Sequence, residues 1–227
     1  MSYFILTDDE NVASLKGICY ILPKNLITCY LQNSLFEKNI IEWSKQFCSL
    51  EKNILDIGAH TGTYALSLAK HCKHVHAFEP QRMTYYALCG SVALSNLENV
   101  TCHNFGLGSF DQVGEKTLNI VSVDGGGSSL HVGNDKILRT EKINISTLDS
   151  LFLTDISFIK MDVEDNEYFV LMGGLETLKK NNYPKILFEC NDVRKNERLF
   201  GLLSKFYNII KISGSSNMYL ADDKGLS

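Results

Sequence analysis

Two short segments of the sequence combine glycines and carboxylates at a spacing that could bind a nucleoside. Residues 56–63 read DIGAHTGT, and Gly58 and Gly62 permit a tight backbone turn that approaches a ligand closely. Glu79 ends the next predicted strand, where a carboxylate can accept both hydrogen bonds of a ribose diol. Asp56 lies inside the strand before the turn, where its carboxylate suits a cationic amine. These residue types predict a site for a ribose and for a positively charged group.

The turn at 56–63 differs from the two common phosphate-binding patterns. The G-x-G-x-x-G dinucleotide motif needs a glycine where His60 stands, and a P-loop needs a lysine where Thr63 stands. A ligand that has a ribose, an ammonium and a sulfonium but no phosphate is S-adenosylmethionine (SAM). We therefore expect SAM to be the cofactor.

The elements that must position these residues alternate between strand and helix. Apolar runs ended by glycine or proline predict strands, and apolar residues at helical spacing predict helices. The predicted strands are residues 53–57, 75–79, 100–104, 158–161 and 185–189, and the predicted helices are residues 63–71, 83–95, 166–180 and 193–205. Residues 207–212 and 218–221 predict an antiparallel hairpin. This alternation is typical of an α/β fold with a mostly parallel sheet.

Two segments stand outside the alternation. Residues 1–50 contain a hairpin-like start and a predicted helix over 35–47, and we expect them to form a cap or lid on a main domain of residues 51–227. Residues 106–150 are rich in Gly, Ser and Thr. Because such a stretch buries little apolar surface, we expect ligand-binding loops there, mobile over 106–135 until ligands bind.

The composition is that of an ordinary globular protein. The chain has 227 residues, 22 Lys and Arg against 26 Asp and Glu, a net charge of −4 and 44% hydrophobic residues. This balance disfavours a dedicated nucleic-acid binder. The sequence has no basic signal-peptide start and no run of roughly 20 apolar residues. The seven cysteines lack C-x-x-C spacing, so we expect reduced thiols in a cytoplasmic protein without a membrane span.

Five blocks of the sequence, in this order and spacing, resemble the FkbM family of SAM-dependent methyltransferases. They are ILDIGAHTG at 54–62, AFEP at 77–80, GLG at 106–108, the stretch 146–167 that contains FIKMDVE, and ILFE at 186–189. The resemblance covers about residues 35–190. Two positions depart from the family pattern, since His60 stands where the family usually has Asn, and Asp165-Asn166 replaces a usual Gly-Ala.

The resemblance implies a Rossmann-like class I methyltransferase fold with a seven-stranded, mostly parallel sheet and a C-terminal antiparallel hairpin. It also implies methyl transfer to a hydroxyl oxygen, with sugars and polyketides among the acceptors of the family. The expected acceptor is therefore a small molecule or glycan, foremost a sugar hydroxyl, and no nucleic acid. The residues expected to bind SAM are Asp56, Gly58, Ala59, His60, Thr61, Gly62, Thr63, Tyr64, Glu79, Pro80, Asn104, Gly106 and Leu107.

The acceptor side of such a site needs a group that takes the proton of the hydroxyl. Asp162 and Glu189 end two central strands whose carboxyl ends face one crevice, so either could be the base. Lys160 points to the same side of its strand as Asp162 and could hold a carboxylate or the developing oxyanion. The alternatives are a purely structural ion-pair cluster, a divalent cation between the carboxylates, and His131 as the base. We expect no bound metal.

Other functions of a SAM-binding fold compete with this one. They are methylation of nucleic acid or protein, and SAM binding without catalysis. Base methyltransferases often carry Asp/Asn-Pro-Pro-aromatic after the fourth strand, whereas residues 162–165 read DVED. The presence of Lys160, Asp162 and Glu189 favours catalysis. The sequence therefore predicts a SAM-dependent O-methyltransferase.

Overall fold

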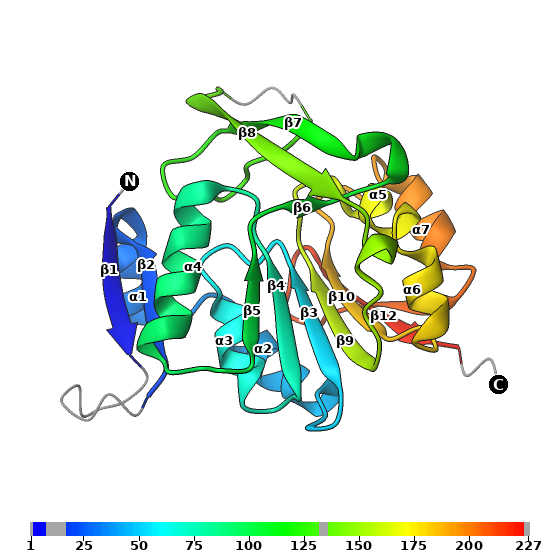
Figure 1. Cartoon of the computed structure of the whole chain (residues 1–227), viewed down its shortest axis with the longest axis horizontal. Helices are drawn as coiled ribbons and strands as arrows, with labels where there is room; N and C mark the ends of the chain where they lie inside the picture. The colour runs from blue at the N-terminus through cyan, green and yellow to red at the C-terminus, as the bar shows by residue number, and fades with distance from the viewer. Residues whose placement is uncertain (1, 8–16, 132–135, 225–227) are drawn as a thin grey trace.

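A seven-stranded sheet forms the centre of the molecule (Figure 1). The computed structural model describes residues 2–7, 17–131 and 136–224. The strand order is β11-β12-β10-β9-β3-β4-β5, and β12 alone runs antiparallel to its neighbours. The strands are β3 (Asn53–Ile57), β4 (His74–Phe78), β5 (Val100–His103), β9 (Ile156–Met161), β10 (Lys185–Glu189), β11 (Tyr207–Lys211) and β12 (Met218–Asp223). The predicted Rossmann-like α/β fold with a C-terminal antiparallel hairpin is confirmed.

The central strands are apolar on both faces because both faces are covered. Ile54 of β3 packs in one core with residues of α3, whereas its neighbour Leu55 packs in a second core with residues of α5 and α7. Figure 1 shows α2, α3 and α4 near β3, β4 and β5, and α5, α6 and α7 near β9, β10 and β12. These helices are α2 (Lys38–Ser44), α3 (Thr63–Ala69), α4 (Arg82–Leu94), α5 (Glu167–Met172), α6 (Leu175–Lys180) and α7 (Glu197–Leu203).

The helix predicted over 166–180 is two helices, α5 and α6, separated by Gly173 and Gly174. A Cβ at Gly173 would collide with the carbonyl oxygen of Gly108. The chain therefore ends α5 where its backbone packs directly against the backbone of another segment. The apolar spacing on both sides of the break is helical, which is why the sequence predicted one helix.

Residues 106–150 are not only loops, which corrects the prediction for this segment. They contain β6 (Gly106–Leu107), β7 (Gly114–Ile120) and β8 (Arg139–Ser146), which form a second sheet in the order β6-β8-β7. Leu118, Ile120, Ile143 and Ile145 alternate with polar residues along β7 and β8 and form a small core of their own. Figure 1 shows β7 and β8 crossing the end of the central sheet.

The N-terminal residues form a hairpin that packs beside α4, followed by two short helices. The hairpin pairs β1 (Tyr3–Thr7) with β2 (Cys19–Pro23), and it is followed by α1 (Ile27–Asn33) and α2. The N–H of Ile21 donates to Ser91 Oγ of α4 at 2.9 Å, which attaches the hairpin to the main sheet's helices. Residues 1 and 8–16 of the predicted cap lie outside the described residues. The predicted helix over 35–47 is α2 and a following 3₁₀ turn.

Two further expectations concern the whole described chain. All seven cysteines lie among the described residues, and no disulfide joins any two of them. Among the residues that the structure describes, no helix has both the length and the apolar character that crossing a membrane requires.

Candidate cofactor and acceptor site

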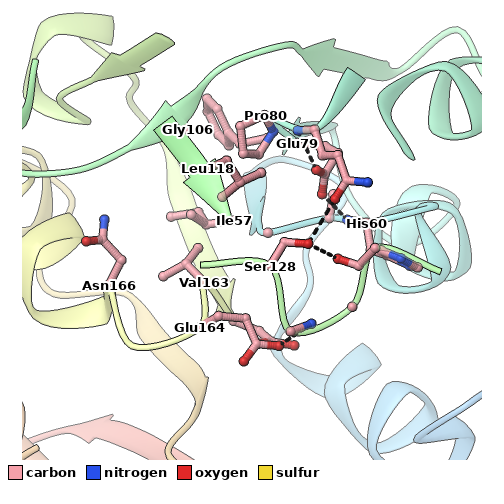
Figure 2. Close-up of a pocket in the computed structure, with 18 of the residues that line it drawn as sticks. Ile57, His60, Glu79, Pro80, Gly106, Leu118, Ser128, Val163, Glu164 and Asn166 are labelled. Carbon is pink, nitrogen blue, oxygen red and sulfur yellow. Dashed lines mark hydrogen bonds between the residues drawn. The ribbon is translucent and has the colours of Figure 1, made fainter. Parts of the chain in front are cut away.

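A cavity of about 400 Å³ lies at the carboxyl ends of β3, β4 and β9. In Figure 2, His60 and Glu79 lie toward one end of it and Glu164 and Asn166 toward the other, with Ser128 between them. Two predicted catalytic residues line it, Lys160 and Asp162. The predicted SAM-binding residues that line it are Gly58, Ala59, His60, Thr63, Tyr64, Glu79, Pro80, Gly106 and Leu107.

The turn between β3 and α3 depends on glycine at its first position. Gly58 has φ +80°, and a Cβ there would collide with the carbonyl oxygen of Asp162. The N–H groups of Gly58 and Ala59 both donate to the carbonyl of Phe78, at 3.0 and 2.9 Å. The glycine therefore lets the cofactor turn pack directly against the residue predicted to act on the acceptor.

Glu79 is buried at the end of β4, and its carboxylate organises the cavity wall. Oε2 accepts the N–H of His60 at 2.8 Å, and Oε1 accepts the N–H of Gln81 at 2.8 Å and the hydroxyl of Thr84 at 3.0 Å. Burial raises the pKa of Glu79, whereas His60 and these donors act in the opposite direction. Among the described residues Oε2 accepts from His60 alone, so it retains a lone pair for a ligand hydroxyl.

Four of the predicted SAM-binding residues do not line the cavity. Asp56 is 1% exposed, and its carboxylate accepts the N–H of Ala65 at 2.9 Å in α3. Thr61 is fully buried, and a Cβ at Gly62 would point at leucine side chains of the core. Asn104 donates to the backbone carbonyls of Glu79 and Pro80. These residues support the cavity wall from behind.

Lys160 is a buried ammonium surrounded by oxygen atoms. Its Nζ donates to the carbonyl of Gly58 at 2.9 Å and lies 3.5 Å from Asp162 Oδ2 and 3.7 Å from Asp56 Oδ1. Burial lowers the pKa of Lys160, but the carboxylates of Asp162 and Asp56 outweigh burial and hold the pKa above its ordinary value. Lys160 therefore stays charged and joins the cofactor turn to the acceptor side.

Three carboxylates converge beside Lys160. One oxygen each of Asp162, Glu164 and Glu189 lies within 4.8 Å of the other two, an arrangement that could also hold a hard divalent cation. Burial, followed by the charge of Asp162, raises the pKa of Glu164 to about 7 and that of Glu189 to about 9. Glu189 is not part of the cavity wall and accepts the side-chain N–H of Asn217. The raised pKa favours a protonated Glu189 at neutral pH, and Asp162 is the predicted base that lines the cavity.

His131 lies outside the cavity wall. Its Nε2 is 3.3 Å from Asn166 Oδ1, and its ring stacks on Phe169 with centroids 5.7 Å apart. These contacts make it part of the packing around α5. The structure does not bring His131 together with Lys160 and Asp162.

An apolar part of the cavity was not predicted from the sequence. Leu118, Ile143 and Ile145 of β7 and β8 line it together with Pro80 and Leu107. An adenine ring needs such apolar walls, and these lie beside Glu79, the predicted ribose partner. The signal that could have found them is the apolar alternation in 118–120 and 143–145.

The glycine-rich loop, residues 122–130, crosses the cavity and forms hydrogen bonds at both ends of the cavity. The Nε2–H of His60 donates to the carbonyl of Asp124 at 2.9 Å, and the hydroxyl of Ser128 donates to Gln81 Oε1 at 3.1 Å. On the other side the N–H of Gly127 donates to Glu164 Oε1 at 3.0 Å. Residues 125–128 thus lie between the proposed cofactor and acceptor ends.

The fold and the site together define the class of protein. A glycine turn without room for a Cβ, a buried strand-end carboxylate and apolar walls fit SAM, in a sheet with the topology of class I methyltransferases. Residues 56–213 match the Methyltransferase FkbM domain, so the chain belongs to the FkbM family of methyltransferases. It is a SAM-dependent methyltransferase by family.

Several solved methyltransferases share the fold at low sequence identity. An rRNA methylase from Streptococcus thermophilus has a TM-score of 0.52 at 12% identity, over 84% of this chain and 99% of its own. The precorrin-6y C5,15-methyltransferase from Geobacter metallireducens has a TM-score of 0.53 at 10% identity, over 88% and 91%. A Streptococcus mutans protein assigned as a methyltransferase, in complex with SAH, has a TM-score of 0.51 at 11% identity, over 83% and 99%. A search of proteins with curated functions found no significant match.

Proposed function

We propose that the protein transfers the methyl group of SAM to a hydroxyl oxygen of a small molecule or glycan, foremost a sugar. The observation that carries this proposal is the position of Asp162. Its N–H continues the β3–β9 hydrogen bonding by donating to the carbonyl of Ile57 at 2.9 Å, directly beside the cofactor turn. Its carboxylate faces the cavity 3.5 Å from Lys160. A hydroxyl held there would have a base next to the methyl donor.

Bound SAM supplies an electrophilic methyl group, and the residues of this chain supply the rest. Asp162 accepts the proton of the acceptor hydroxyl at a carboxylate oxygen as the oxygen becomes nucleophilic. Lys160 holds Asp162 in place and offsets its charge. The glycine-rich loop excludes water, which keeps the acceptor oxygen and the methyl carbon close together.

The walls of the cavity disfavour an anionic acceptor. Glu37, Glu79, Asp162 and Glu164 line it, whereas the single lysine in its lining is already surrounded by carboxylates. A nucleic acid would bring phosphates toward this surface, and the likeness to an rRNA methylase is one of fold alone. A neutral polyol avoids this repulsion. This supports a sugar hydroxyl over RNA.

The test is transfer of label from methyl-labelled SAM to a panel of free sugars, methyl glycosides, total RNA and protein. We expect label in a sugar, as an ether that survives mild base. Label only in RNA or protein would replace the proposed acceptor class. Tight SAM binding without transfer to any member of the panel would favour either a non-catalytic domain or an acceptor outside the panel. Repeating the assay with cell extracts fractionated by charge would distinguish these two cases.

Two further parts of the proposal concern organisation. We propose that residues 1–50 act as a cap on the methyltransferase domain of residues 51–227, which is supported by Tyr30 and Glu37 in the cavity wall. A cytoplasmic location is proposed as well, and the lack of disulfides among the seven described cysteines suits a reducing compartment.

A further inference from the structure

The N-terminal segment contributes residues to the cavity although it lies outside the matched family domain. The domain match begins at residue 56, yet Leu26, Tyr30, Phe36 and Glu37 line the cavity. Glu37 is the charged member of this group. It directly precedes α2, with a left-handed φ of +55°.

A hydrogen bond holds the Glu37 carboxylate at the cavity mouth. The hydroxyl of Tyr64 donates to Glu37 Oε2 at 2.7 Å. Tyr64 is buried at the start of α3, and both burial and the charge of Glu37 raise its pKa, so the phenol remains a donor. Glu37 itself is exposed, which leaves its other oxygen open to a ligand.

The sheet order determines which part of SAM can reach Glu37. With its ribose at Glu79, at the end of β4, and its adenine in the apolar walls of β6, β7 and β8, the cofactor must extend its amino-acid part toward β3 and α3. Tyr64 and Glu37 lie on that side. Asp56, the carboxylate that the sequence suggested for the ammonium, is buried behind the wall.

We propose that Glu37 binds the ammonium group of the methionine part of SAM, with Tyr64 as the residue that positions its carboxylate. A charged hydrogen bond between carboxylate and ammonium is the chemistry expected for this end of the cofactor. The N-terminal segment thereby completes the cofactor site of the family domain. The inference concerns the cofactor alone and is independent of the acceptor.

The test compares Glu37→Gln with the wild type for three ligands in calorimetric titrations. SAM and SAH carry the ammonium, whereas 5′-methylthioadenosine lacks the amino-acid part. The amide oxygen of the variant still accepts from Tyr64, so only the charge is removed. We expect the affinity for SAM and SAH to fall about tenfold. This loss is at the lower end of the range for a charged hydrogen bond, because Glu37 is partly solvated. Affinity for 5′-methylthioadenosine should be unchanged.

Glu42→Gln is the matched control, because Glu42 lies in α2, the helix that Glu37 precedes, but pairs with Lys45 at 2.7 Å and does not line the cavity. It should bind all three ligands like the wild type. Wild-type affinity of Glu37→Gln for SAM would overturn the proposal. An equal loss for all three ligands, with an unchanged melting temperature, would also overturn it, since the effect would then not concern the amino-acid part.

Discussion

At the scale of single residues, Glu79 both shapes the cavity and offers a ligand contact. Its carboxylate satisfies the N–H groups of His60 and Gln81 and the hydroxyl of Thr84. The sequence predicted its ligand role from its place at a strand end. It could not predict the three internal donors, since their positions depend on how the turn at 58–62 and the start of α4 fold around the carboxylate.

The internal donors change what a substitution of Glu79 should do. Glu79→Gln should lower SAM affinity at least tenfold, because a charged hydrogen bond contributes about 1.5–3 kcal/mol. It should also destabilise the fold, because one of the backbone N–H donors loses an acceptor while the amide brings donors of its own. Calorimetric titration and urea unfolding on the same sample measure both effects. A folded variant with wild-type affinity would remove Glu79 from the site.

Glu189 differs from Asp162 although both end central strands. The folded protein keeps a proton on Glu189 up to about pH 9, whereas the unfolded chain releases it near the ordinary value of 4.5. The folded state therefore binds more protons between these values, and stability falls as the pH rises through this range.

Glu189→Gln should flatten this dependence, since the amide resembles the protonated acid. We expect the variant to lose less stability than the wild type in urea unfolding between pH 5 and pH 9, with turnover at pH 7 little changed. Parallel pH profiles for the two proteins would show that Glu189 does not carry this proton. A large loss of turnover at pH 7 would instead assign it a direct part in the chemistry.

At the scale of elements, the segment 106–150 shows where the sequence was insufficient. Its glycines and serines predicted loops, yet the alternation along β7 and β8 buries Leu118, Ile120, Ile143 and Ile145. In a glycine-rich segment, an alternating pattern predicts a strand reliably only when the strand that pairs with it is known. The break at Gly173 could not be predicted for the same reason, because it depends on the packing of Gly173 against the backbone of Gly108, which is distant in the sequence.

The glycine-rich loop should report ligand binding. Residues 122–130 are held to the rest of the protein by a few hydrogen bonds, including those to His60, Gln81, Glu164 and Asn119, and bury little apolar surface, so local opening should cost little. Amide exchange over 122–130 should be fast in the free protein and slow when SAH is bound. Slow exchange without ligand would contradict this expectation. Residues 132–135 of the predicted mobile segment lie outside the described residues.

Gly173 and Gly201 form a matched pair for the packing of the helices. Gly173→Ala should destabilise the protein by about 1–3 kcal/mol, because its Cβ would displace the Gly108 backbone. A Cβ at Gly201 in α7 meets no atom within 4 Å, so Gly201→Ala should stabilise by up to about 1 kcal/mol. Urea unfolding measures both changes. Equal effects of the two substitutions would refute the close approach at Gly173.

At the scale of the whole molecule, the order of strands and helices could be predicted from the sequence. Whether a given side chain is buried or lines the cavity could not. Apolar runs and their punctuation identify β3, β4, β9 and β10 and the reversed hairpin. Asp56 lies inside β3 and Asp162 directly follows β9, but the former is buried under α3 and the latter lines the cavity. That difference depends on α3, whose Ala65 N–H binds Asp56, and on Lys160, which meets both carboxylates only after folding.

The central claim is that Asp162 is the base of a SAM-dependent methyl transfer. The most direct test is a single-turnover measurement on wild type and Asp162→Asn, both saturated with labelled SAM, with an acceptor found in the sugar panel. We predict unchanged SAM affinity and a methyl-transfer rate lower by about 10²–10⁴, as expected when a general base is lost. A variant that binds SAM normally and transfers the methyl group at the wild-type rate would contradict the claim.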